Sequence, residues 1–110
     1  MSIQHFDLVN GRWQKLSFFE QMANIGSEVE RTIKWKNKNN AEYSRLAFER
    51  ALELLDLTIE NEKSKSHLRE LLRVREMLAD HFVFNNEYVS TDESWQNYFY
   101  VFNFAARINL

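Results

Sequence analysis

The stretch LRELLRVREMLADHFV, residues 68–83, decides the fold class of this chain. Its apolar residues recur at spacings of three and four, which is the period of one face of an α-helix. They are Leu68, Leu71, Leu72, Leu78, Ala79 and Phe82. At about 100° per residue, Arg75 falls in the middle of this apolar stripe. A buried guanidinium needs a partner, so the sequence predicts a paired polar centre around Arg75.

Helical signals also occur on both sides of this stretch. Ser17 and Glu20 have the spacing of a capping box, and the helix that they begin should run to about residue 38. A second helix is expected over residues 40–60, and a last one from a capping box at residues 90–93 to about Ile108. Because the connections are short, sequential helices should be antiparallel neighbours.

The composition supports the same fold class. The chain has no proline and two glycines, which leaves few sites for the sharp turns of an all-β domain. We therefore predict one all-α domain, an up-down-up-down four-helix bundle over residues 17–110, preceded by a short irregular arm over residues 1–16. Asn10-Gly11 is a hairpin signal, and this turn should pack Trp13, together with Phe6 and Leu8, on the bundle. The alternative is a partly ordered tail.

Several function classes are disfavoured. The chain has no cysteine, which excludes disulfides and zinc–thiolate sites. No phosphate-binding loop, metalloprotease motif or nucleophile elbow is present, and we expect neither a metal nor a cofactor. The net charge of −2 argues against a broad nucleic-acid binder. No apolar run is long enough to span a membrane and no signal peptide is evident, so a cytoplasmic protein is expected.

The expected partner of Arg75 is Glu30. Glu30 lies at the rim of the apolar stripe of the first helix, next to Gly26, where a mid-helix glycine suggests close approach by a bulky group. Tyr98 would add a hydroxyl to this polar centre. The acids of the second helix (Glu42, Glu49, Glu53, Asp56 and Glu60) point away from its apolar arc and predict a solvated face. The arginine would either fix the register of the helices or bind an anion.

Residues outside the expected core predict self-association. Tyr100 and Phe104 lie on the far side of the last helix, and Met77 and Phe84 lie outside the main stripe of the third. Tyrosine, phenylalanine and methionine suit protein interfaces, and twofold dimers are the commonest assembly. The sequence therefore predicts a homodimer, and a protein partner is also possible. The alternative is that the N-terminal arm covers these residues.

The segment from Arg75 to His81 resembles the motif of HEPN-type helical ribonucleases, which carry an arginine and a histidine on one helix. The resemblance implies that Arg75 would contact a scissile phosphate of RNA and that His81 would act in acid–base cleavage. A helical partner of a nucleotidyltransferase, with a similar architecture, is a further alternative. Since side chains six residues apart point in different directions, a shared site would need a second protomer.

Residues 23–31, 45–59 and 68–82 are similar to a group of small uncharacterised helical proteins of archaea and bacteria. The resemblance covers residues 17–108 and implies a free-standing helical protein without a known activity. The leading expectation is therefore a non-enzymatic interaction module, and a HEPN-like ribonuclease is the alternative.

Overall fold

The computed structural model describes residues 11–108, which form a four-helix bundle and so confirm the predicted all-α fold class. A short 3-10 turn comes first. The elements are η2 (Trp13–Lys15), α1 (Phe18–Asn37), α2 (Ala41–Asn61), α3 (Lys65–Phe82) and α4 (Asp92–Ile108).

The helix starts follow local side-chain chemistry. Ser17 and Glu20 form the predicted capping box of α1, each side chain accepting the other residue's backbone N–H. Asn40 caps α2 by accepting the N–H of Tyr43. The box predicted at residues 90–93 is wrong by one position. Thr91 Oγ1 accepts the N–H of Ser94, whose own Oγ accepts the N–H of Thr91.

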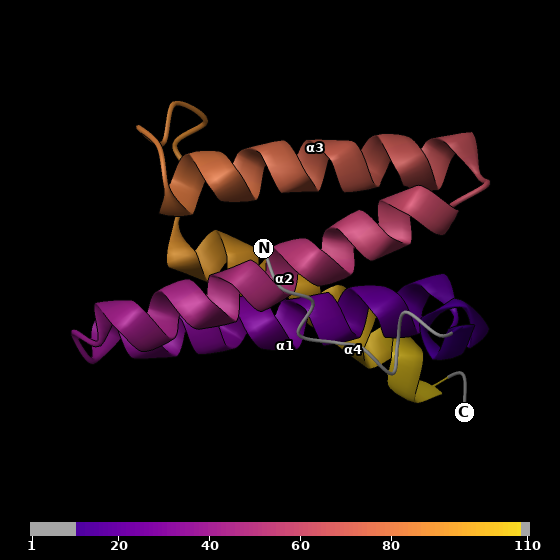
Figure 1. Cartoon of the computed structure of the whole chain (residues 1–110), viewed down its shortest axis with the longest axis horizontal. Coiled ribbons are helices and arrows are strands. Elements are labelled where there is room, and N and C mark those ends of the chain that lie inside the picture. Colours follow the sequence, from indigo (N-terminus) through magenta and orange to yellow (C-terminus); the bar gives the residue numbers. More distant parts are fainter. Residues whose placement is uncertain (1–10, 109–110) are drawn as a thin grey trace.

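Helix α1 is the centre of the bundle. It packs with α2 on one side and with α4 on another, and α3 packs on α2. In Figure 1, α2 lies between α1 and α3, and α3 forms one edge of the molecule. Between α3 and α4, polar contacts such as Tyr98–Glu70 and His81–Asp92 occur beside a groove that Val74 and Trp95 line.

The core follows the predicted stripe of α1 with one correction. Met22, Val29 and Ile33 are buried as expected, whereas Phe19 is 42% exposed and does not belong to the inner stripe. Gly26 permits the close approach of α4, because an added Cβ would lie 2.7 Å from Cβ of Phe99. The bulky neighbour of this glycine is therefore a ring of α4.

Helix α3 is rotated relative to the prediction. Its buried face is centred on Leu71, Val74 and Leu78, whereas Leu72 is exposed. Arg75 lies about 60° around the helix from Leu78, at the rim of this face. This rotation has a physical cause: it buries a continuous apolar face while the guanidinium keeps its access to water.

The N-terminal arm contributes directly to the core. Trp13 is 1% exposed and donates its indole N–H to Thr58 Oγ1 at 2.8 Å. The side chain of Gln21 donates to the carbonyl of Trp13 at 3.0 Å. Residues 13–15 form a 3-10 turn that packs Trp13 on the bundle as predicted. Phe6 and Leu8 lie outside the described residues.

None of the helices within residues 11–108 combines the length and the apolar character that crossing a membrane requires.

Candidate functional sites

Arg75 forms an ion pair with Asp56 of α2. Its Nε donates to Oδ1 at 2.7 Å, and its Nη2 lies 3.5 Å from Oδ2. The two side chains are 40% and 49% exposed. The predicted enclosed arginine is therefore wrong. Its partner comes from the acidic face of α2, which is exposed at Asp56 as the sequence predicts.

Glu30 has a different partner from the one predicted. Its carboxylate accepts a hydrogen bond from the side-chain amide of Gln96 on α4 at 3.1 Å, and this contact is exposed. Glu30 lines a groove of about 410 Å³ between α1 and α4, with Phe99 and Tyr100 on the other wall. The structure does not bring Glu30 and Arg75 together.

Tyr98 is half-buried and connects α4 to α3. Its hydroxyl donates to the carboxylate of Glu70. Burial, followed by the hydrogen bond and the negative charge of Glu70, raises the pKa of the Tyr98 phenol well above its ordinary value. Glu70 and Tyr98 border a mostly apolar groove of about 210 Å³ with Met77 in its wall. Tyr98 thus takes part in a polar contact, but in a different one from the predicted centre.

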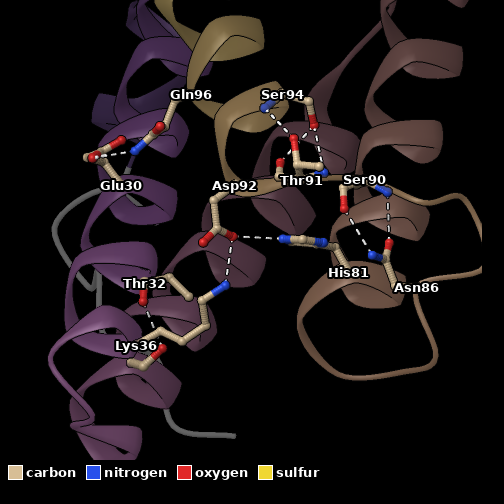
Figure 2. A network of polar contacts seen from close by, with 11 residues as sticks. Glu30, Thr32, Lys36, His81, Asn86, Ser90, Thr91, Asp92, Ser94 and Gln96 are labelled. Carbon is tan, nitrogen blue, oxygen red and sulfur yellow. Dashed lines mark hydrogen bonds and ion pairs between the residues drawn. The ribbon is translucent and has the colours of Figure 1, made fainter.

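His81 belongs to a three-helix polar cluster that is drawn in Figure 2. Its Nε2 lies 2.9 Å from Oδ1 of Asp92, and the same oxygen accepts a hydrogen bond from Nζ of Lys36 at 2.7 Å. The histidine side chain is 9% exposed and the aspartate side chain 28%. Lys36 also lies over the ring of Phe82, 5.3 Å from its centroid. Asp92 therefore connects the start of α4 with the ends of α1 and α3.

The neighbours of Asp92 stabilise the ionised form of its carboxyl group. Burial would raise the pKa of this carboxyl, but the hydrogen bonds and positive charges of Lys36 and His81 outweigh burial and lower the pKa below its ordinary value. Asp92 is also the first residue of α4, where the helix dipole favours a negative charge. The cluster therefore has a structural role. We name Lys36, His81 and Asp92 the clasp.

The segment before α4 extends this network. Asn86 donates its side-chain amide to the carbonyl of Ser90 and accepts the N–H of Ser90, both at 2.9 Å. Figure 2 shows this pair beside the Thr91–Ser94 cap and the Asp92 cluster. The whole start of α4 is therefore fixed by side-chain hydrogen bonds.

Arg75 and His81 do not form one site within a chain. Arg75 contacts α2 through Asp56, and His81 contacts α4 through Asp92. A phosphate contact and a proton-transfer group would have to converge on one bond for RNA cleavage. Among residues 11–108, no group of three or more potential metal ligands occurs either.

The predicted interface residues differ in their surroundings. Tyr100, Phe104 and Phe84 are each more than half exposed, whereas Met77 is partly buried against the core. Eight of the eleven large hydrophobic residues that are exposed within residues 11–108 fall into two groups, four on the outer face of α4 and four in the loop before it.

The sequence indicated several residues that form polar contacts, but it did not indicate their partners. Asp92 had a signal, since an acid at a helix start suits the dipole. Lys36 carried none, because it is distant in sequence from Asp92 and a lysine in the last turn of a helix is already explained by the helix dipole. Asp56 was assigned to solvent only because the rotation of α3 was unknown.

Comparisons with protein-family models, with curated proteins and with solved structures find no match for this chain, so they indicate no family.

Proposed function

We propose that this protein is a helical interaction module that acts as a homodimer, with the outer face of α4 as the contact surface. The proposal rests on one observation, a contiguous group of apolar side chains that we name the α4 strip. Its members are Tyr100, Val101, Phe104 and Ile108. We further propose a cytoplasmic setting, because secreted domains of this size commonly depend on disulfides and this chain has no cysteine.

The α4 strip has the composition of an interface core. Tyr100 is 64% exposed and Phe104 is 53% exposed, and their rings stack with centroids 6.5 Å apart. No charged residue lies between Tyr100 and Phe104 in sequence. Aromatic side chains that are rigid and already in contact lose little freedom on binding, which favours association.

The spacing of the α4 strip suits a second copy of the same chain. Tyr100 and Ile108 lie four residues on either side of Phe104, so they share its face of the helix. If two α4 helices cross antiparallel at Phe104, apolar side chains oppose each other along the whole strip. A crossing centred on Tyr100 would instead place Phe104 near the polar residues Gln96 and Asn97 of the second copy.

The exposed area of the α4 strip is sufficient for a weak dimer. An aromatic side chain buries about 150–250 Å² when enclosed, so each member of the strip offers on the order of 100 Å². Two copies then contribute roughly 800 Å² of apolar surface, and a polar rim brings the total to about 1,200 Å², the lower end for specific interfaces. We therefore expect a reversible dimer.

Sedimentation equilibrium tests this proposal. The wild-type protein should approach twice the mass of one chain as its concentration rises, because the α4 strips pair. The Phe104→Glu variant should stay at the mass of one chain, since two carboxylates would meet at the crossing point. Leu72→Glu is the matched control, because Leu72 is a half-exposed residue of α3. A wild-type monomer at every concentration, or a dimeric Phe104→Glu variant, would refute the proposal.

A further inference from the structure

The loop between α3 and α4 presents a second apolar surface at the opposite end of α4 from the strip. We name residues 83–89 the apolar loop. Four of its seven side chains are hydrophobic and more than half exposed, namely Val83, Phe84, Tyr88 and Val89. Phe84 is 71% exposed and Val89 is 79% exposed. Concentrated apolar exposure of this kind marks an interaction surface.

The apolar loop is held in one conformation. The buried carboxylate of Asp80 accepts the backbone N–H groups of Glu87 at 2.8 Å and Tyr88 at 3.0 Å. Two hydrogen bonds between Asn86 and Ser90 close the other side of the turn. The loop therefore displays its apolar side chains from a prepared backbone, which lowers the entropy cost of binding.

The backbone of Val89 is strained. Its φ of +55° lies in the left-handed region, which β-branched residues rarely adopt. Asn86 also has a positive φ, 53°, but asparagine tolerates it. Packing does not compensate for the backbone strain at Val89, because the Val89 side chain is mostly exposed to solvent. Strain that packing does not explain is typical of binding segments.

The charge on one side of the apolar loop indicates the chemistry of a partner. Glu76, Asp80 and Glu87 all act electrostatically on Tyr88, and Glu76 also accepts the Tyr88 hydroxyl at 2.9 Å. Glu87 is exposed and has no ion pair with any residue from 11 to 108. The Tyr88 side of the loop therefore attracts cations, whereas Val83 on the other side lines a groove with Lys36 and Arg45.

We infer that the apolar loop is a docking site for a basic amphipathic segment of another protein. The apolar side of that segment would cover Phe84 and Val89. Its lysine or arginine side chains would lie near Glu87 and over the exposed aromatic rings. This inference goes beyond the proposed dimer, because the loop and the α4 strip are separate surfaces.

Binding of two synthetic helical peptides, measured by fluorescence anisotropy, tests the inference. One peptide has a leucine face flanked by lysines, and the other has the same leucine face flanked by glutamates. The wild-type protein should bind the lysine peptide, and rising salt should weaken the binding. The glutamate peptide should bind at least tenfold more weakly. Equal binding of both peptides would overturn the inference.

Substitutions locate the contact. Phe84→Ser and Glu87→Gln should each weaken binding of the lysine peptide, by about tenfold for Phe84 as a central apolar contact. Leu72→Ser and Glu60→Gln are matched controls on other exposed surfaces, and they should bind like the wild type. If Phe84→Ser also binds like the wild type, the peptide contacts another part of the acidic surface and the inference fails.

Two further variants separate binding from folding and from dimerisation. Val89→Gly relieves the strain, so it should raise the melting temperature while weakening the peptide contact. Phe104→Glu removes the α4 contact and should leave peptide affinity unchanged. A loss of peptide binding in Phe104→Glu would show that the loop does not act independently and would overturn the inference.

Discussion

Arg75 illustrates how little an exposed ion pair contributes. The side chains of Arg75 and Asp56 both keep close to half of their surface in water, where screening and side-chain entropy offset the attraction. Arg75→Ala should therefore lower the free energy of unfolding by less than about 1 kcal/mol. Urea denaturation checks this value. A loss of several kcal/mol would mean that the guanidinium is enclosed after all.

Trp13 should matter far more than Arg75, although it precedes the helices. Its ring is buried and its indole N–H is bonded to Thr58. Trp13→Ala should cost about 3–5 kcal/mol, the range for a large aromatic residue in a core. Trp35→Ala is the matched control, because Trp35 is only partly buried. Equal urea midpoints for the two variants would contradict the assignment of Trp13 to the core.

At the scale of the elements, the contact between α1 and α4 depends on Gly26. A methyl group there gains helix propensity worth about 1 kcal/mol, but it must displace the Phe99 side chain, whose Cβ would lie 2.7 Å away. Overpacking typically costs about 1–3 kcal/mol, so Gly26→Ala should be destabilising on balance. Thermal melting measures this effect. A higher melting temperature would show that α4 can move away from α1 freely.

The clasp between α1, α3 and α4 predicts a pH dependence. Because the pKa of folded Asp92 lies below its ordinary value, its stabilising effect is complete above that ordinary value, about 4. It is lost as the pH falls towards the folded pKa. Asp92→Asn should therefore be less stable than the wild type at pH 7, and the difference should shrink below about pH 4.

Chemical denaturation of both proteins between pH 3 and pH 7 measures that difference. Asp56→Asn serves as the control, because Asp56 is more exposed than Asp92 and should show a smaller change. A gap between Asp92→Asn and the wild type that stays constant over this range would exclude the proposed ionic origin of the clasp.

The sequence was sufficient for the helices but not for their rotation. Capping residues such as Ser17 and the repeated apolar positions of α1 are local signals, and they predicted the first helix closely. In α3, however, Leu72 and Val74 lie about 160° apart around the helix and extend the apolar stripe of Leu71 and Leu78 in opposite directions. Only packing against α2 decides between them. The error in the partner of Arg75 follows from that choice, as does the unexpected meeting of His81 with Asp92.

At the scale of the whole molecule, two surfaces carry most of the large apolar side chains that are exposed within residues 11–108. The α4 strip lies in the C-terminal half of α4, and the apolar loop lies just before its start. In the proposed assembly the strips pair two chains, and each chain presents its own loop. Such a dimer would offer two copies of one docking site, which increases the avidity for a partner with two binding segments.

Cysteine cross-linking tests the central claim most directly, because the natural chain contains no cysteine. A Phe104→Cys variant has its single thiol at the proposed twofold crossing of α4. Under mild oxidation it should form a covalent dimer rapidly, whereas Leu72→Cys, with a comparably exposed position on α3, should remain monomeric. Equal cross-linking of the two variants, or none at Phe104→Cys, would contradict the pairing of the α4 strips.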